Sequence, residues 1–210
     1  MMETLEKIFG SAAKVKIMRL FLFNPTEVYD IDQIIVRSKV SPAEARHEVG
    51  MMEKVGLIKK RSFFKDFTVG KGKNKKIERR RVGGFMVDET FDYLLPLQDV
   101  LIHISPLRNA EVLRKLGRVG KLKLVIVSGV FINNWDSRID LLVVGDLLRK
   151  GTLENIVKTL ESEIGREIRY AYFETPDFQY RLGIYDKLIR DILDFPHEKI
   201  LDRLNIRISR

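Results

Sequence analysis

The segment 41–56 constrains the fold most, because it carries both the start and the stop signal of one helix. Ser41 and Pro42 open it, and Glu44 follows Ser41 at the spacing of a capping box. Gly56 ends it. The inward face is predicted to be the apolar stripe of Ala45, Val49, Met52 and Val55.

Two β-compatible runs follow this helix at once. They cover 57–64 and 77–82 and flank a tip at 69–76 with the sequence VGKGKNKK. Apolar and β-branched residues on either side of a tip that contains Gly and Asn predict a β-hairpin. The sequence therefore predicts a helix that leads directly into a hairpin with a basic tip.

Two shorter helices are predicted upstream, over 11–23 and 31–36. Three helices followed by a hairpin is the order of a winged helix-turn-helix domain. The stretches Ser41–Arg46 and Val55–Ile58 resemble the recognition helix and first wing strand of bacterial and archaeal winged-helix regulators of the arsenic-repressor type. The resemblance covers about residues 5–88 and implies a DNA-binding transcriptional regulator.

Positive charge is concentrated in the same region. From Lys54 to Arg81 the chain has twelve Lys or Arg against Asp66 and Glu78, a net charge of +10, whereas the whole chain carries +9. Such a concentration is typical of a surface that binds a polyanion, because each neutralised phosphate releases a counterion. A solvated basic loop would have the same composition. The surrounding architecture must therefore distinguish a polyanion-binding surface from such a loop.

With that architecture we expect double-stranded DNA as the partner. The third helix would enter the major groove while the wing contacts phosphates. The residues expected near base edges are Ser41, Glu44, Arg46 and His47. The residues expected at phosphates are Lys71, Lys73, Lys75, Lys76, Arg79, Arg80 and Arg81. An RNA-binding protein that uses the same basic hairpin is an alternative.

Residues 90–116 have a helical pattern that Pro96 and Pro106 interrupt, which predicts two or more short helices. We expect them to form a connector over 89–118. By analogy with winged-helix regulators, this stretch is also the expected surface for a homodimer.

Residues 119–210 are predicted to form a small α/β domain with a short mixed sheet. The predicted elements are strands over 121–127, 138–144 and 168–173, a helix over 153–164, a turn at Glu174-Thr175-Pro176 and a C-terminal helix over 188–193. The expected fold class is therefore α+β, with an N-terminal winged helix-turn-helix domain over 1–88, the connector over 89–118 and this α/β domain over 119–210.

Two stretches of the second domain carry a further resemblance. Residues 128–130 read SGV at the end of a predicted strand, and residues 136–146 read DSRIDLLVVGD. They resemble the core of the small nucleotidyltransferases related to polymerase beta, over about 119–175. In that family a Gly-Ser pair opens a phosphate-binding helix and an Asp-x-Asp pair holds two magnesium ions, which implies roles for Gly129 and Asp140.

The departures from that family pattern favour a domain without catalysis. Val130 stands at the serine position, and Arg138 stands at the first aspartate, where it would repel magnesium and neutralise Asp140. Asp136 is placed on the same predicted strand face and is a substitute ligand, while Glu174 lies at the end of the next strand. The degenerate motif expected is Gly129, Asp136, Arg138 and Asp140.

We expect this second domain to sense a ligand, to dimerise or to recruit a partner. A nucleotide is the candidate effector, and no cofactor or metal is expected. The alternative is an active metal-dependent nucleotidyltransferase of the toxin-antitoxin or antibiotic-modifying kind, tethered to a nucleic-acid-binding module.

Composition excludes several other classes. With no cysteine and three scattered histidines, disulfides, thiolate metal sites and a zinc centre are not expected. No run approaches the roughly 20 apolar residues of a membrane span, and the N-terminus lacks the pattern of a signal peptide. We expect a cytoplasmic protein with no membrane partner.

Overall fold

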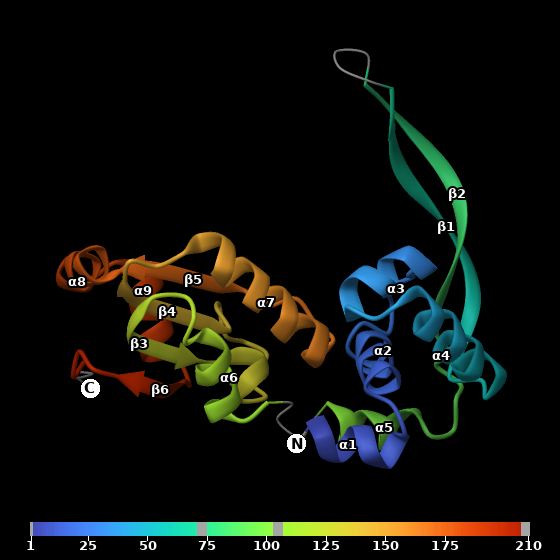
Figure 1. The fold of residues 1–210 in the computed structure, drawn as a ribbon, viewed down its shortest axis with the longest axis horizontal. Helices are drawn as coiled ribbons and strands as arrows, with labels where there is room; N and C mark the ends of the chain where they lie inside the picture. The colour runs from blue at the N-terminus through green and yellow to red at the C-terminus, as the bar shows by residue number, and fades with distance from the viewer. Residues whose placement is uncertain (1, 71–74, 103–106, 207–210) are drawn as a thin grey trace.

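The computed structural model describes residues 2–70, 75–102 and 107–206. The fold is mixed α+β, with a two-stranded sheet and a separate four-stranded sheet. We call residues 2–102 the N-terminal half and residues 107–206 the C-terminal half (Figure 1). Within the described residues, no helix has the length and apolar character needed to cross a membrane.

Four helices begin the chain: α1 (Met2–Phe9), α2 (Ala12–Phe23), α3 (Ile31–Ser38) and α4 (Pro42–Lys54). The sequence predicts the last three but not α1. Each of these three begins at a side chain that accepts a free backbone N–H. Ser11 caps α2, and capping boxes open the other two, formed by Asp30 with Gln33 and by Ser41 with Glu44. Local sequence therefore determines where these helices start.

The strands β1 (Ile58–Val69) and β2 (Lys76–Val87) form an antiparallel hairpin that extends away from the helices (Figure 1). Each strand has 12 residues, so both are longer than the predicted runs at 57–64 and 77–82. The distal residues are mostly exposed on both faces, and for that reason no alternation of buried and exposed positions marks them in the sequence.

The base of the hairpin is anchored to the helices. Tyr29, between α2 and α3, exchanges two backbone hydrogen bonds of 2.9 Å with Phe85 of β2. The neighbouring Gly84 permits this approach, since a Cβ there would lie 2.8 Å from the carbonyl oxygen of Tyr29. Lys65 of β1 also forms an ion pair with Asp30, the N-cap of α3. These contacts hold the base of the hairpin in a defined position.

The inward stripe of α4 is confirmed except at its end. Ala45, Val49 and Met52 are buried in the core of the N-terminal half, but Val55 is 60% exposed. The exposure arises because α4 ends at Lys54 and the chain then turns toward β1.

Two short helices occupy the middle segment, α5 (Leu94–Leu101) and α6 (Asn109–Leu116), as the proline interruptions predict. Pro96 lies in the first turn of α5, where a missing N–H costs no helical hydrogen bond. Pro106 lies outside the described residues. Leu101 of α5 is buried in the N-terminal core, and Leu116 of α6 is buried against the four-stranded sheet.

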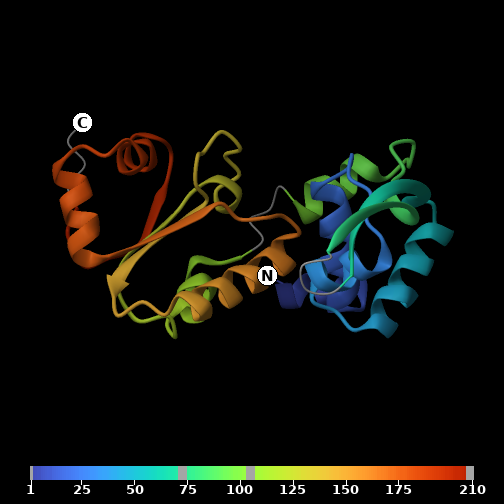
Figure 2. The ribbon, with the colours of Figure 1, turned by 90° about the horizontal axis from the view of Figure 1, so that it is seen from above.

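The four-stranded sheet has the order β5-β4-β3-β6 and is mixed, because β4 and β5 run parallel and the other neighbours run antiparallel. Its strands are β3 (Lys121–Val127), β4 (Leu141–Asp146), β5 (Tyr170–Glu174) and β6 (Glu198–Asp202). One face is covered by α6 and α7 (Lys150–Ile164), and the other by α8 (Thr175–Gly183) and α9 (Lys187–Asp194). Figure 2 shows these helices on opposite sides of the sheet.

Two predictions in this half are corrected, and one strand was not predicted. The strand predicted at 138–144 begins only at Leu141, and the preceding residues form a loop with one 3-10 turn at Gly129–Phe131. The turn predicted at 174–176 instead opens α8, with Pro176 in its first turn, where proline is tolerated. The strand β6 has no predicted counterpart.

The two halves meet where the end of α7 packs against α2. Arg19 of α2 is fully buried there and donates from Nε to the Leu101 carbonyl and from Nη1 to the Glu163 carbonyl, both at 2.9 Å. Burial lowers the pKa of Arg19 to about 10, so its guanidinium stays charged at neutral pH. Gly165 ends α7 with φ +92°, and a Cβ there would lie 2.5 Å from the carbonyl carbon of Arg19. The two helices therefore pack closely where α7 ends, and the buried guanidinium of Arg19 stabilises this contact through its hydrogen bonds.

Candidate nucleic-acid interface

The outward face of α4 begins at its capping box. Ser41 Oγ accepts from the Glu44 N–H at 3.2 Å, and Glu44 Oε2 accepts from the Ser41 N–H at 2.9 Å. These bonds hold the pKa of the exposed Glu44 carboxyl below its ordinary value. Both residues are therefore engaged in starting the helix, although they are exposed as predicted.

The next turn of α4 is open. Arg46 and His47 are exposed, and the Arg46 guanidinium makes a long contact of 3.5 Å to the Pro42 carbonyl. Gly50 follows on the same side, and a Cβ at this position would meet no atom within 4 Å. A glycine inside a helix costs about 1 kcal/mol relative to alanine. No internal contact requires that cost here, so the helix has a smooth outer surface that another molecule can approach closely.

The opposite face of α4 fixes its orientation. Glu48 is 5% exposed, and its carboxylate accepts from Ser11 Oγ at 2.8 Å and lies 3.6 Å from Lys14 Nζ. Both partners belong to the start of α2. Because this buried carboxylate is paired, it holds α4 against α2 with Arg46 and His47 turned outward.

The hairpin cations fall into two groups. Some are paired with acidic residues: Lys59 with Asp88, Lys60 with Glu53, Lys65 with Asp30 and Arg80 with Glu78. Others form no ion pair among the described residues: Arg61, Lys75, Lys76, Arg79 and Arg81. Of the predicted phosphate contacts, Arg80 is thus already engaged, and Lys71 and Lys73 lie outside the described residues.

Two of the unpaired cations of β2, Arg79 and Arg81, share one face of the strand. Arg79 and Arg81 are two positions apart in the strand, so their side chains point to the same face. Their register partners on β1 are Asp66 and Phe64, whose side chains lie on that face too. The Arg79 guanidinium lies 5.2 Å from the centre of the Phe64 ring, which is itself 60% exposed. Among the described residues neither guanidinium forms an ion pair, and the same face carries the exposed Phe64 ring and the Asp66 carboxylate.

A hollow of about 400 Å³ lies at the hairpin base. Its lining includes Lys60, Arg61 and Ser62 of β1 and Gly83 of β2, and Lys60 also pairs with Glu53 of α4 at 2.8 Å. A Cβ at Gly83 would meet no atom within 4 Å, so the missing side chain leaves this surface open. Sequence patterns alone do not place these residues in the site. The Gly83-Gly84 pair inside a strand was the available signal, since glycine in a strand often marks close approach of another backbone.

The loop from Gly129 to Asp140 is closed by its own contacts. Asp140 is 3% exposed, and its Oδ1 accepts from the Val130 N–H at 3.1 Å while its Oδ2 accepts from the Arg169 N–H at 2.8 Å. The Arg169 side chain adds an ion pair at 3.2 Å. A Cβ at Gly129 would lie 1.9 Å from Oδ1, so the glycine and the carboxylate are packed directly together.

Two expected roles in this loop are corrected. Arg138 does not neutralise Asp140; it is exposed and pairs with Asp191 of α9, while Arg169 takes the expected position beside Asp140. Asp136 is exposed and lies outside any strand, so it does not share a strand face with Arg138. The strand geometry fails because the chain stays irregular until Leu141.

The residues of this loop do not fit a pair of magnesium ions. Both oxygens of Asp140 accept hydrogen bonds from the chain, and Arg169 places a positive charge beside them. Glu174 instead accepts the N–H groups of Leu147 and Leu148, each at 3.0 Å. Across residues 2–70, 75–102 and 107–206, no group of three acidic or histidine side chains is placed to hold a metal ion.

Comparison of this chain with family models, with curated proteins and with solved structures finds no match.

Proposed function

We propose that the N-terminal half is a winged helix-turn-helix domain and that the protein is a transcriptional regulator that binds double-stranded DNA. In this proposal α4 is the recognition helix and the β1–β2 hairpin is the wing. The observation that carries it is that a helix with an open face, at Arg46 and His47, leads directly into a hairpin on which Arg79 and Arg81 form no ion pair among the described residues.

The chemistry of the exposed groups assigns base contacts to α4 and phosphate contacts to the hairpin. Arg46 is the residue on α4 that can contact a guanine edge with two parallel hydrogen bonds. Lys76, Arg79 and Arg81 lie on an extended hairpin and suit phosphates, which carry charge but no sequence information. The smooth surface at Gly50 allows the helix to lie close to the groove.

We propose that the C-terminal half is a nucleotidyltransferase-like domain that has lost nucleotide transfer. The satisfied carboxylate of Asp140 supports this, because two-metal chemistry needs converging carboxylates that are free to bind the ions. The active-enzyme alternative requires Asp140 to release both its backbone partners and Arg169, and no observation favours that.

We further propose that two copies associate through α5. Leu95 and Val100 of this helix are 71% and 42% exposed, and its N-cap Tyr93 is 66% exposed. Pairing two such helices around a two-fold axis would present two recognition helices to a palindromic site. Leu95→Glu should convert a dimer to a monomer in sedimentation equilibrium. A wild-type chain that is already monomeric at the same concentration would refute this part.

DNA binding is tested by fluorescence anisotropy on duplexes selected from genomic fragments, over a range of salt concentrations. The variant Lys76→Ala/Arg79→Ala/Arg81→Ala should weaken all duplexes and flatten the slope of log affinity against log salt by about 2.7, at about 0.9 for each phosphate contact. The matched control Lys121→Ala/Lys158→Ala/Lys187→Ala removes the same charge from the C-terminal half and should leave the slope unchanged.

Equal effects of the two triple variants would mean that only net charge matters, and the hairpin would lose its role. A duplex RNA competitor of the same sequence distinguishes the RNA alternative. Preference for RNA over DNA would overturn the regulator proposal.

A further inference from the structure

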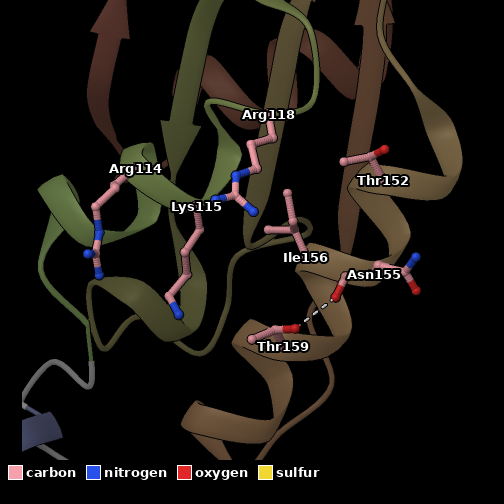
Figure 3. Close-up of a pocket in the computed structure, with 7 residues that line it drawn as sticks. All are labelled: Arg114, Lys115, Arg118, Thr152, Asn155, Ile156 and Thr159. Carbon is pink, nitrogen blue, oxygen red and sulfur yellow. Dashed lines mark hydrogen bonds between the residues drawn. The ribbon is translucent and has the colours of Figure 1, made fainter.

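A second basic site lies in the C-terminal half, far along the chain from the hairpin. It is a pocket of about 500 Å³ between α6 and α7, shown in Figure 3. One side is formed by Arg114 and Lys115 of α6 and by Arg118 just after it. The other side presents polar side chains of α7, namely Thr152, Asn155 and Thr159. The pocket shares no lining residue with the Asp140 loop.

The pocket is lined by three cations and no carboxylate. Arg114 and Arg118 form no ion pair within the described parts of the chain, and Lys115 pairs with Glu163 at 2.7 Å. In Figure 3 the Lys115 and Arg118 side chains extend toward α7. A positively charged pocket lined by hydroxyl and amide groups offers the donors that phosphate oxygens accept.

Stabilisation of α6 explains only part of this arrangement. Basic residues in the last turn of a helix interact favourably with its C-terminal dipole, which accounts for Arg114 and Lys115. It does not account for Arg118, which follows the helix, or for the polar row on the facing helix. A binding role explains both.

We propose that this pocket binds a small molecule that carries two or more phosphate groups. One phosphate ion would fill only part of about 500 Å³, a size typical of sites for small ligands. Arg114, Lys115 and Arg118 together can neutralise more than one phosphate. Ile156, which also lines the pocket, offers an apolar contact for a non-phosphate part of the ligand.

The pocket is connected to the recognition helix through α3. Lys39 is the C-cap of α3, two residues before the Ser41 cap of α4, and its ammonium donates to Thr159 Oγ1 at 2.8 Å. On the other side of the pocket, the Glu163 that pairs with Lys115 offers its carbonyl to Arg19 of α2. A ligand that engages Thr159 and Lys115 therefore acts on residues that contact α3 and α2.

We infer that occupancy of the pocket weakens DNA binding, and this part rests on the proposed function. The ligand places negative charge beside Thr159, whose hydroxyl donates to the Asn155 carbonyl and accepts from Lys39. That charge attracts the Lys39 ammonium toward the pocket and so acts on the turn before α4. By thermodynamic linkage, DNA must weaken binding of the ligand by the same factor.

Binding is tested first on the free full-length chain, without DNA or metal, by calorimetric titration of pyrophosphate and of ADP. The wild type should bind, and Arg114→Ala/Arg118→Ala should bind at least tenfold more weakly. The control Lys150→Ala/Lys158→Ala removes the same charge from α7 residues outside the pocket and should bind as the wild type does. No binding by the wild type, or equal losses in the two double variants, would overturn the proposal.

Melting curves accompany this titration, because an unfolded variant would imitate lost binding. The single variant Arg118→Glu, placed after the end of α6, provides a second measurement and should also bind at least tenfold more weakly. A folded Arg118→Glu protein with wild-type affinity would count against the site.

A second set of measurements separates a small ligand from the phosphates of DNA. Without ligand, Arg114→Ala/Arg118→Ala should bind duplex DNA with wild-type affinity and salt slope. If its slope flattens as in the hairpin variant, DNA itself occupies this surface and the proposal is wrong.

The link to DNA binding is tested with saturating pyrophosphate at matched ionic strength. Wild-type affinity for duplex DNA should fall, and Lys39→Gln should abolish that fall while still binding pyrophosphate. Persistence of the effect in Lys39→Gln would refute the connection through α3. Absence of duplex binding by the wild type would refute the proposed function but leave the pyrophosphate titration as an independent test of the pocket.

Discussion

The hairpin and the Gly129–Asp140 loop both stand out in the sequence for their charges, yet their surroundings are opposite. On the hairpin, Arg79 and Arg81 are exposed and lack acidic partners among the described residues. In the loop, Asp140 is 3% exposed and both its oxygens accept hydrogen bonds from the chain. A charge that the chain leaves unpaired is available to a ligand, whereas a buried charge that is already satisfied maintains local structure.

The largest expected difference between the two regions is in stability, and it is tested with one glycine from each region. Gly129→Ala should lower the free energy of unfolding by more than about 3 kcal/mol, because the new Cβ meets Asp140 and the backbone is held in the left-handed region. A Cβ at Gly83 meets nothing, so Gly83→Ala should change stability by less than about 0.5 kcal/mol. Urea unfolding measures both. Similar values would mean that the loop is not packed as described.

The second test removes one charge from each region. Asp140→Ala leaves the N–H groups of Val130 and Arg169 without their acceptor, and we expect a loss of about 2 to 3 kcal/mol in stability with no change in DNA affinity for the folded fraction. Arg81→Ala should do the reverse, leaving stability nearly unchanged and weakening DNA binding.

Incubation of the wild type with labelled nucleoside triphosphates and magnesium or manganese should yield no transfer. Transfer that Asp140→Ala abolishes would return the loop to a catalytic role.

The third test asks whether the two proposed DNA-contacting elements differ from each other. Arg46→Ala should cost about 1 to 3 kcal/mol at one base position of the selected duplex while nonspecific affinity stays nearly unchanged. The hairpin variants should instead weaken all sequences alike. Binding to a panel of single-base variants of the duplex distinguishes these outcomes. A uniform loss with Arg46→Ala would reassign that residue to a phosphate.

The smallest expected effect concerns the hairpin base. Burial raises the pKa of Tyr29 to about 12. The folded state therefore holds this proton more tightly than the unfolded state, and the stability it contributes is present below pH 10 and lost as pH rises through 12. Between pH 9 and 11 the loss should be about 1 kcal/mol. Tyr29→Phe keeps the backbone pairing with Phe85 and should lack this part of the alkaline loss in chemical unfolding curves; an identical pH dependence would contradict it.

The sequence predicts the elements whose signals are local. Ser41 with Glu44 marks the start of α4 because a capping box needs only residues three apart. The hairpin is also predicted, but not its length, because exposed distal strands carry no burial pattern. The sequence predicts the start of β4 too early, since Arg138 and Ile139 fit a strand pattern that the chain does not adopt before Leu141.

In the candidate site, too, some features follow from local sequence and others depend on tertiary contacts. The sequence alone determined the concentration of cations between Lys54 and Arg81 and the outward position of Arg46 on a capped helix, because charge and helical period belong to consecutive residues. Which of those cations are already paired depends on the tertiary fold, as the ion pair of Lys65 with Asp30 illustrates. The tertiary fold likewise decided that Arg169 reaches Asp140 and that Arg118 faces Thr159 across a pocket. Such contacts join residues dozens of positions apart, and their free energy depends on burial and geometry that no local pattern contains.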